Sequence, residues 1–357
     1  MSAKQSVTLN DVAREAGVSV ATVSRVLNQK ARADAQTREK IFKAVETLGY
    51  DDSAIIRKVS EKISTPRVEL KAELLLCPMP EQKNLLQLDF MAEILRGIQS
   101  YFNRHRNVTL NISTWEPEAD REEKRLLLRR LNSVSGVIIM GSPDETLMNF
   151  LQRNAVRYVL LPNDLPDKSV NSISSDDFSG GFRAAEYLIQ KGFRKIGFLC
   201  GSSLAPSHTM RKYGVMAATV ERLGIEAFES RNARTSDDTD IEQCFIDWFD
   251  SGKCPPALVT SHAKAAEVIC RILEARGKSC PQDLSLITFD SEVRLNSGVR
   301  ISYFRTFPRE LGRRGAQQLY QLMTVSHPGD KVCKTLVPLD FQEGNSVRDS
   351  EETMNCR

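Results

Sequence analysis

The chain has 357 residues, 41% of them hydrophobic and 27% charged, so it can bury a large core and we expect two or three domains. It contains no apolar run of about eighteen residues, so we expect no membrane-spanning helix. The first residues, M-S-A-K-Q-S-V, contain no hydrophobic signal region, and we therefore expect the protein to stay in the cytoplasm.

Two short helices joined by a tight turn are predicted near the N-terminus. The segment from Thr8 to Asn28 reads T-L-N-D-V-A-R-E-A-G-V-S-V-A-T-V-S-R-V-L-N. Thr8 can cap the first helix with Asp11 in the reciprocal position, and Gly17 can end that helix with a left-handed backbone. Ser19 can then cap a second helix that starts at once.

The second helix presents an exposed face that suits DNA. Its apolar residues Val23 and Val26 face the first helix, which leaves Val20, Ala21 and Arg25 pointing outwards. Two helices joined by a tight glycine-containing turn form a helix-turn-helix, whose second helix lies in the major groove. An ordinary corner between two helices is the alternative, but caps, glycine and an exposed arginine coincide here and favour the helix-turn-helix.

A third helix and the charge distribution support this interpretation. Asp34 can cap a helix that carries Ile41 and Leu48 on one face. Residues 1–62 hold 11 Lys and Arg against 8 Asp and Glu, while residues 63–357 hold 38 of each kind. The whole formal excess of +3 therefore lies in the first segment, and it has the sign expected for a module that contacts phosphates.

These three helices resemble the DNA-binding headpiece of the lactose/galactose repressor family. The resemblance is carried by V-T-L-N-D-V-A-R-E-A-G-V-S-V-A-T-V-S-R-V-L-N followed by T-R-E-K-I-F-K-A-V-E-T-L-G-Y. It implies a homodimeric transcriptional regulator, a repressor of carbohydrate-utilisation genes that binds pseudo-palindromic operator DNA and a small-molecule effector. The residues that it implies at the DNA interface are Thr8, Leu9, Ser19, Val20, Ala21, Thr22, Ser24, Arg25, Asn28, Arg32, Tyr50 and Val59.

Residues 51–66 are expected to form a hinge between the headpiece, residues 1–50, and a core. In the family this hinge carries Pro-Asn and a Leu; its short helix orders on operator DNA and wedges that Leu into the minor groove. Here Asp-Ser at 52–53 stands in the place of Pro-Asn, Ile56 replaces a small residue and Val59 takes the Leu position. A plain linker is the alternative.

From Val68 onward, short apolar runs alternate with amphipathic helical stretches. The predicted strands lie at 69–77, 109–114, 136–141, 157–161, 195–200, 257–260 and 284–289. The predicted helices lie at 89–105, 121–132, 145–153, 179–191, 212–223, 241–250 and 263–276. This alternation predicts an α/β fold of parallel sheets flanked by helices, and so many units need two lobes with a cleft between them.

The core resembles the periplasmic-binding-protein-like core of the same family. The resemblance is carried by S-G-V-I-I, E-Y-L-I-Q-K-G-F-R-K-I-G-F-L-C-G and P-Q-D-L-S-L-I-T-F-D. It implies an effector-binding and dimerisation core at 67–345, with an N-lobe at about 67–163 and 302–328, a C-lobe at about 164–301 and 329–345, and a tail at 346–357. The tail contains no leucine heptads, so we expect no tetramerising helix.

An enzyme is the weaker interpretation. Ser202, Ser203 or Cys200 could act as a nucleophile only with a base such as His208 and a carboxylate in hydrogen-bond reach. The sequence contains no G-x-S-x-G, no G-x-G-x-x-G and no phosphate-binding loop, so we expect no catalytic activity. The eight cysteines are scattered and form no C-x-x-C pair, so we expect reduced thiols, no metal site and no cofactor.

Polar residues that follow the predicted strands are candidates for effector binding. Open parallel sheets bind ligands at the carboxyl ends of their strands, and sugar recognition needs carboxylate, amide and guanidinium groups that pair with hydroxyls. By position, the resemblance implies contacts from Asp144 and Asp290, and Arg211 is retained from the family's set. His262 stands where an Asn is usual, and Thr306 replaces a longer polar residue.

We therefore expect a small sugar or glycoside between the lobes, with Phe304 or Phe307 as its apolar stacking face. A nucleoside, a purine or a protein is the alternative effector, and a core that serves only dimerisation is a further alternative. A solute-binding protein is opposed by the headpiece and by the lack of a signal region.

Overall fold

The computed structural model describes residues 7–27, 35–48, 69–78, 84–165, 169–201, 205–325 and 331–350. Two compact units separate after Val68, so the N-terminal helices and the core are described one at a time. None of the helices in these residues is long and apolar enough to cross a membrane.

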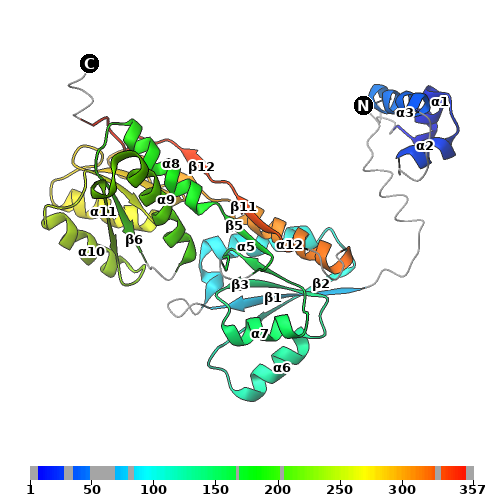
Figure 1. Ribbon diagram of the computed structural model, residues 1–357, viewed down its shortest axis with the longest axis horizontal. Helices are drawn as coiled ribbons and strands as arrows, with labels where there is room; N and C mark the ends of the chain where they lie inside the picture. Colours follow the sequence, from blue (N-terminus) through cyan, green and yellow to red (C-terminus); the bar gives the residue numbers. More distant parts are fainter. Residues whose placement is uncertain are drawn as a thin grey trace. The chain divides into compact units, whose positions relative to one another are not determined.

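The N-terminal unit has the three helices that the sequence predicts. They are α1 (Leu9–Ala16), α2 (Val20–Leu27) and α3 (Ala35–Leu48) (Figure 1). Val12, Val23 and Ile41, one from each helix, are fully buried against one another. Each helix therefore hides an apolar stripe and leaves its polar face to solvent.

The first lobe of the core is a six-stranded parallel sheet with helices on both faces. Its strands, in spatial order, are β11 (Lys334–Val337), β5 (Ser172–Ser175), β4 (Tyr158–Leu161), β3 (Gly136–Gly141), β1 (Leu70–Cys77) and β2 (Val108–Thr114). The covering helices are α5 (Asp89–Phe102), preceded by η1 (Leu85–Gln87), and α12 (Pro308–Thr324) on one face, with α6 (Arg121–Leu131) and α7 (Glu145–Arg153) on the other. Because both faces are covered, β3 is buried along its whole length.

The second lobe repeats this architecture. Its strands, in spatial order, are β12 (Asp340–Gln342), β10 (Ser302–Arg305), β9 (Ser285–Asp290), β8 (Ala257–Thr260), β6 (Ile196–Cys200) and β7 (Phe228–Asn232). All neighbours are parallel except β10 and β12. The covering helices are α8 (Asp177–Gln190) and α9 (Pro206–Leu223) on one face, with α10 (Asp238–Asp250) and α11 (Ala263–Ala275) on the other; η2 (Ile225–Ala227) links α9 to β7.

The chain passes between the lobes three times, and strand pairing corrects the predicted lobe boundaries. The sequence places 164–301 in the C-lobe, yet β5 pairs with β4 in the first sheet. Likewise β11, predicted in the C-lobe, pairs with β5, whereas β10, predicted in the N-lobe, pairs with β9. Each of these strands has only four residues and pairs with distant segments, so no local pattern marks the sheet that it joins.

Several elements lie outside the ranges that the sequence predicts: β5, β7, β10, β11, β12 and α12. In addition, α9 begins at Pro206, where the sequence predicts a helix only from residue 212. Its first turn is polar and carries no apolar stripe, so only the proline at the first helical position signals its start. The remaining predicted helices and strands agree with the structure to within a few residues.

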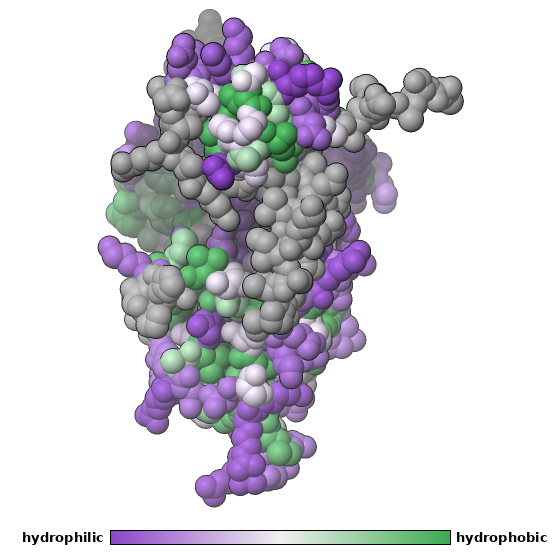
Figure 2. Space-filling view, turned by 90° about the vertical axis from the view of Figure 1, so that its right-hand side faces the viewer, coloured by the Kyte–Doolittle hydropathy of each residue, from purple (hydrophilic) through white to green (hydrophobic). Residues whose placement is uncertain are grey.

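Hydrophobic residues on the surface are dispersed. Figure 2 shows that those on the visible face lie in small groups separated by hydrophilic residues. Exposed large apolar side chains of the core include Ile112 on the edge strand β2 and Leu126 on α6. Single exposed apolar residues of this kind are normal on protein surfaces.

The helices α8 and α9 cross closely because glycines lie at their contact. A Cβ atom on Gly181 would lie 2.1 Å from the carbonyl oxygen of Arg211, and one on Gly214 would lie 2.1 Å from that of Phe178. No other residue fits at either position without moving a helix. The crossing brings the first turn of α8 against Arg211 on α9.

Candidate functional site

The first two helices of the N-terminal unit have the caps that the sequence predicts. Asp11 accepts hydrogen bonds from the backbone N–H and the hydroxyl of Thr8, at 2.9 and 2.6 Å. Gly17 ends α1 with a φ of 65°, which is the left-handed region that glycine adopts at little cost. The Oγ atom of Ser19 accepts the N–H of Thr22 at 3.1 Å and so caps the start of α2.

The exposed face of α2 carries three of the residues predicted to read DNA. Val20 is 40% exposed, and Ala21 and Arg25 are exposed beside it. Val23 and Val26 lie on the opposite face and are buried in the core of the unit. An arginine next to short apolar side chains can donate to a guanine while its neighbours contact thymine methyl groups. The unit therefore has the geometry of a helix-turn-helix.

The other residues predicted at the DNA interface fall into two groups. Those within the described residues are exposed Thr8 and Ser19 and partly buried Leu9, Thr22 and Ser24. Those outside the described residues are Asn28, Arg32, Tyr50 and Val59, together with the whole predicted hinge at 51–66.

A cavity of about 510 Å³ lies between the two lobes of the core. Its N-lobe wall comes from the start of α5 and the loop after β4, and it includes Phe90, Met91 and Asn163. Its C-lobe wall comes from the residues that end or follow β8 and β9 and from the starts of α8, α9 and α10. Because strand ends and helix starts meet at one edge of a parallel sheet, side chains distant in sequence converge there.

Three of the five predicted effector residues line this cavity: Arg211, His262 and Asp290. The other two, Asp144 and Thr306, are not among its lining residues.

Asp144 is used as a structural residue of the N-lobe. Its Oδ1 atom accepts the N–H of Leu147 at 2.8 Å and so caps α7. Its Oδ2 atom accepts the indole N–H of buried Trp115 at 2.9 Å. The residue follows a strand, as the sequence predicts, but the next helix and Trp115 take both carboxylate oxygens.

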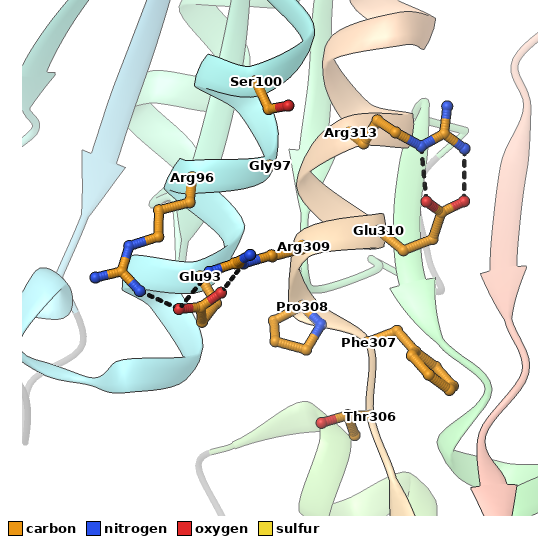
Figure 3. A pocket seen from close by; sticks show the side chains of 10 residues that line it. All are labelled: Glu93, Arg96, Gly97, Ser100, Thr306, Phe307, Pro308, Arg309, Glu310 and Arg313. Carbon is orange, nitrogen blue, oxygen red and sulfur yellow. Dashed lines mark hydrogen bonds and ion pairs between the residues drawn. The ribbon is translucent and has the colours of Figure 1, made fainter.

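Thr306 is 6% exposed and lines a separate depression of about 660 Å³ at the crossing of α5 and α12 (Figure 3). Phe307 and Pro308 lie beside it there, and an ion pair joins Glu93 to Arg309 across the two helices. Thr306 lies on the crossover from β10 in the C-lobe to α12 in the N-lobe. Neither Phe307 nor the 1% exposed Phe304 is among the residues that line that cavity.

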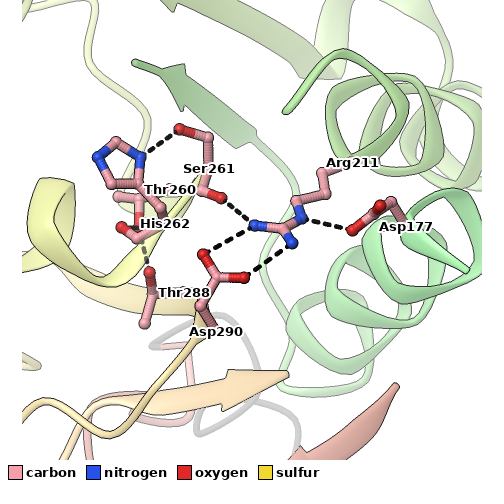
Figure 4. Close-up of polar contacts among 7 residues, drawn as sticks. All are labelled: Asp177, Arg211, Thr260, Ser261, His262, Thr288 and Asp290. Atoms are coloured by element: carbon pink, nitrogen blue, oxygen red, sulfur yellow. Dashed lines mark hydrogen bonds and ion pairs between the residues drawn. The ribbon is translucent and has the colours of Figure 1, made fainter. Parts of the chain in front are cut away.

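Arg211 lies at the centre of the C-lobe wall (Figure 4). Its Nε atom donates to Asp177 Oδ1 at 2.7 Å, and its Nη1 atom donates to the carbonyl oxygen of Ser261 at 2.6 Å. Nη1 and Nη2 also donate to Asp290 Oδ2 and Oδ1, at 3.2 and 2.8 Å. The guanidinium lies over the ring of Phe289, 4.5 Å from its centroid. Protein groups thus accept four of the five N–H donors of Arg211.

Asp177 is the principal residue that sequence reasoning missed. It is the first residue of α8, two residues after the end of β5, so the rule that ligands meet strand ends could have identified it. It was overlooked because the four-residue strand before it, Ser172–Ser175, is polar in sequence although buried in the fold.

Two carboxylates share one guanidinium in this group, so one negative charge remains in excess. The two carboxylates raise the pKa of Arg211, which stays protonated. Burial raises the pKa of Asp177 to about 6, against the opposing attraction of Arg211. Asp290 has a φ of 80°, a costly backbone conformation for a residue with a side chain, and such strain gathers at functional sites.

A pair of histidines forms another part of the C-lobe wall. The rings of His208 and His262 are parallel to within 3°, with centroids 5.0 Å apart. The Oγ atom of Ser261 lies 2.9 Å from Nδ1 of His262. Burial lowers the pKa of His262, so its ring is neutral at pH 7 and combines one donor with one acceptor.

Cys200, one of the candidate nucleophiles, is not activated in this fold. Burial raises the pKa of the Cys200 thiol to about 11, which disfavours the thiolate that a nucleophile needs. Ser202 and Ser203 lie outside the described residues. Within the described part of the chain, no three His, Cys, Asp or Glu side chains are grouped to hold a metal ion.

Comparison with known proteins gives matches in both units. Residues 8–53 match the family described as Bacterial regulatory proteins, lacI family. Residues 185–347 match the family described as Periplasmic binding protein-like domain. Catabolite control protein A of Priestia megaterium is 28% identical over 300 residues, which are 82% of this chain and 85% of that protein.

Solved structures with the same fold include two regulators. The transcriptional regulator CelR–cellobiose complex has a TM-score of 0.63 at 21% identity, covering 95% of this chain and 99% of that one. The lac repressor dimer bound to operator and the anti-inducer ONPF has a TM-score of 0.63 at 22% identity, covering 96% and 100%. At such identities the similarity shows the fold alone.

Proposed function

The chain joins a lacI-family DNA-binding domain to a periplasmic-binding-protein-like domain and is a DNA-binding transcriptional regulator of the lacI family, and we propose that it is a repressor of carbohydrate-utilisation genes. A small sugar or glycoside in the cavity between the core lobes controls its affinity for operator DNA. Its relatives include proteins described as an HTH-type transcriptional regulator and an HTH-type transcriptional repressor.

The observation that carries the DNA-binding part of the proposal is the capped helix-turn-helix with its exposed recognition face. Arg25, Val20 and Ala21 occupy one side of a helix whose other side is buried. This arrangement lets the helix enter the major groove while α1 and α3 hold its angle. Binding to chromosomal operators places the protein in the cytoplasm, on the nucleoid.

A homodimer follows from the size of the recognition helix. An eight-residue helix offers only a few side chains to the bases, and specific interfaces need more contacts than one such helix supplies. Two copies related by a two-fold axis would bind two half-sites, so the operator is pseudo-palindromic. The lac repressor, which has the same fold, binds its operator as a dimer.

The effector part of the proposal rests on the inter-lobe cavity. A ligand that contacts both walls binds more tightly when the lobes close, and it therefore shifts the core toward the closed arrangement. That shift can alter the spacing of the two headpieces in a dimer. The related CelR structure is a complex with cellobiose, which supports a sugar or glycoside here.

A nucleoside or purine is the second candidate, because two parallel imidazole rings and Phe90 line the same cavity and suit a flat heterocycle. Two measurements on the full chain test the proposal. Selection from random DNA should enrich a palindrome, and a thermal-shift screen of sugars, glycosides, nucleosides and purines should find a ligand that changes affinity for it. Failure to enrich any palindrome would contradict the DNA-binding part, and no ligand response would contradict the effector part.

A further inference from the structure

The charges that line the inter-lobe cavity are unbalanced. Four carboxylates, those of Asp89, Asp177, Asp237 and Asp290, face a single guanidinium, that of Arg211. When the histidines are left out of the count, the formal charge of the lining is −3. A ligand with a negative charge would enter a site whose side chains already carry an excess of negative charge.

The guanidinium cannot form a bidentate pair with an anionic ligand while its present partners stay in place. An arginine has five N–H donors, and four of those of Arg211 are used by Asp177, Asp290 and the Ser261 carbonyl. Its side chain is only 3% exposed. To pair with two of its N–H groups, a carboxylate or phosphate on the ligand would have to displace Asp177 or Asp290, which belong to the same chain and already lie within hydrogen-bond distance.

Helix N-termini do not remove this imbalance. Each contributes about half a positive charge, which is the usual reason for an anion to bind at the start of a helix. Here the protein's own carboxylates occupy the starts of three of the helices: Asp89 in α5, Asp177 in α8 and Asp237 in α10. In a fourth helix, α9, Pro206 removes one of the N–H donors at the helix start.

Two of these carboxylates are available to a ligand from opposite lobes. Within the residues that the structure describes, neither Asp89 of the N-lobe nor Asp237 of the C-lobe has an ion-pair partner. Both are exposed, and both line the cavity. A ligand that donates hydrogen bonds or carries an ammonium group can therefore contact both lobes at once. Such a ligand would also reduce the repulsion between the carboxylates of the two lobes.

We propose that the cavity accepts a neutral or positively charged ligand rich in hydrogen-bond donors, such as a free sugar or an amino sugar, and rejects the corresponding uronate or sugar phosphate. The inference rests on the proposed effector function and specifies which chemical form of a carbohydrate the protein senses. Asp177 is the residue that sets this preference, because it keeps Arg211 from binding an anion.

The test compares matched probes on the full-length protein by isothermal titration. For each of the gluco, galacto and manno series, the free hexose, the 2-amino-2-deoxyhexose, the uronate and the hexose 6-phosphate are titrated. The expected result is binding of a hexose or an amino sugar at least about tenfold tighter than binding of its acidic counterparts. Ser207→Trp, which fills the cavity from the first turn of α9, should abolish that binding and so locate it.

Two variants test the role of charge. Asp177→Asn should raise affinity for the uronate or phosphate at least about tenfold, because Arg211 loses one of its two carboxylates. Asp237→Asn, at an exposed helix cap, should act in the same direction without risk to folding. Asp250→Asn, an exposed aspartate paired with Arg276 outside the cavity, is the matched control and should change nothing.

The outcomes separate this inference from the function on which it rests. Tight binding of an acidic probe that Ser207→Trp abolishes would overturn the inference and leave effector control intact. Unchanged anion affinity in both Asp177→Asn and Asp237→Asn would overturn the assigned role of charge. Absence of binding by every probe would overturn the inference together with the sugar effector.

Discussion

Arg211 and Asp290 form a bidentate ion pair at the carboxyl end of β9, with Nη2–Oδ1 at 2.8 Å and Nη1–Oδ2 at 3.2 Å. The arginine side chain is 3% exposed and the aspartate side chain 29%, so the carboxylate reaches the cavity while the guanidinium stays inside. Arg211 therefore orients a carboxylate that lines the cavity and links it to Asp177 on α8. This arrangement makes the arginine a positioning residue.

Replacing the buried cation should destabilise the core strongly. In Arg211→Met, Asp177 remains buried without a partner, and removing one member of a buried ion pair costs about 3–5 kcal/mol in the free energy of unfolding. Adding Asp177→Asn to Arg211→Met should recover a large part of that loss, because no unpaired buried charge is left. Urea unfolding of the wild type, both single variants and the double variant measures the coupling; strictly additive losses would contradict the pairing.

Loss of the exposed arginine on α2 should relax DNA specificity. Arg25→Ala should weaken binding to the selected operator by about 1–3 kcal/mol and reduce the preference at a single base position, since a guanine contact is removed. Arg14→Ala, an exposed arginine on α1 that pairs with Asp11, is the matched control. Binding to a panel of single-base operator variants gives the readout. An equal loss of affinity on every sequence would make Arg25 a phosphate contact.

Asp144 should matter for stability and not for effector binding. Asp144→Ala removes the cap of α7, worth about 1 kcal/mol, and leaves the buried Trp115 N–H without an acceptor, which costs about 1–3 kcal/mol more. Asp120→Ala removes a cap of α6 that has no such buried partner, so its smaller loss is the comparison. Ligand-induced operator release should be unchanged in Asp144→Ala. Loss of this release would show that Asp144 takes part in effector binding.

His262 should make the stability of the core depend on pH. Burial lowers its folded-state pKa below the ordinary value of 6.5, so the unfolded chain binds a proton that the folded protein does not. Its contribution to stability is fully present above pH 6.5 and is lost as the pH falls through the folded-state pKa. The free energy of unfolding is measured for wild type and His262→Gln from pH 8 to pH 5. The wild-type value should fall relative to that of the variant as the pH is lowered. A constant difference would contradict the lowered pKa.

The sequence by itself determined the N-terminal unit. Thr8, Asp11, Gly17 and Ser19 act on backbone groups within three or four residues of themselves, and the buried stripe of α2 follows from helical spacing. Interactions of this kind are complete inside a short segment, so caps, turn and exposed face can be read from one stretch of chain. The alternation of strands and helices in the core could be predicted from the sequence for the same reason.

Only the tertiary structure decided which sheet β5, β10 and β11 join, because strand pairing depends on segments far apart in the chain and leaves no local mark in four residues. The tertiary structure also decided which residues line the cavity. Sequence position suggested Asp144, yet Trp115 and the start of α7 take its oxygens. Asp177 reaches Arg211 across 34 residues because two glycines let α8 and α9 cross closely. Whether a strand-end carboxylate lines the cavity depends on the elements that pack around it, and only the three-dimensional structure shows that packing.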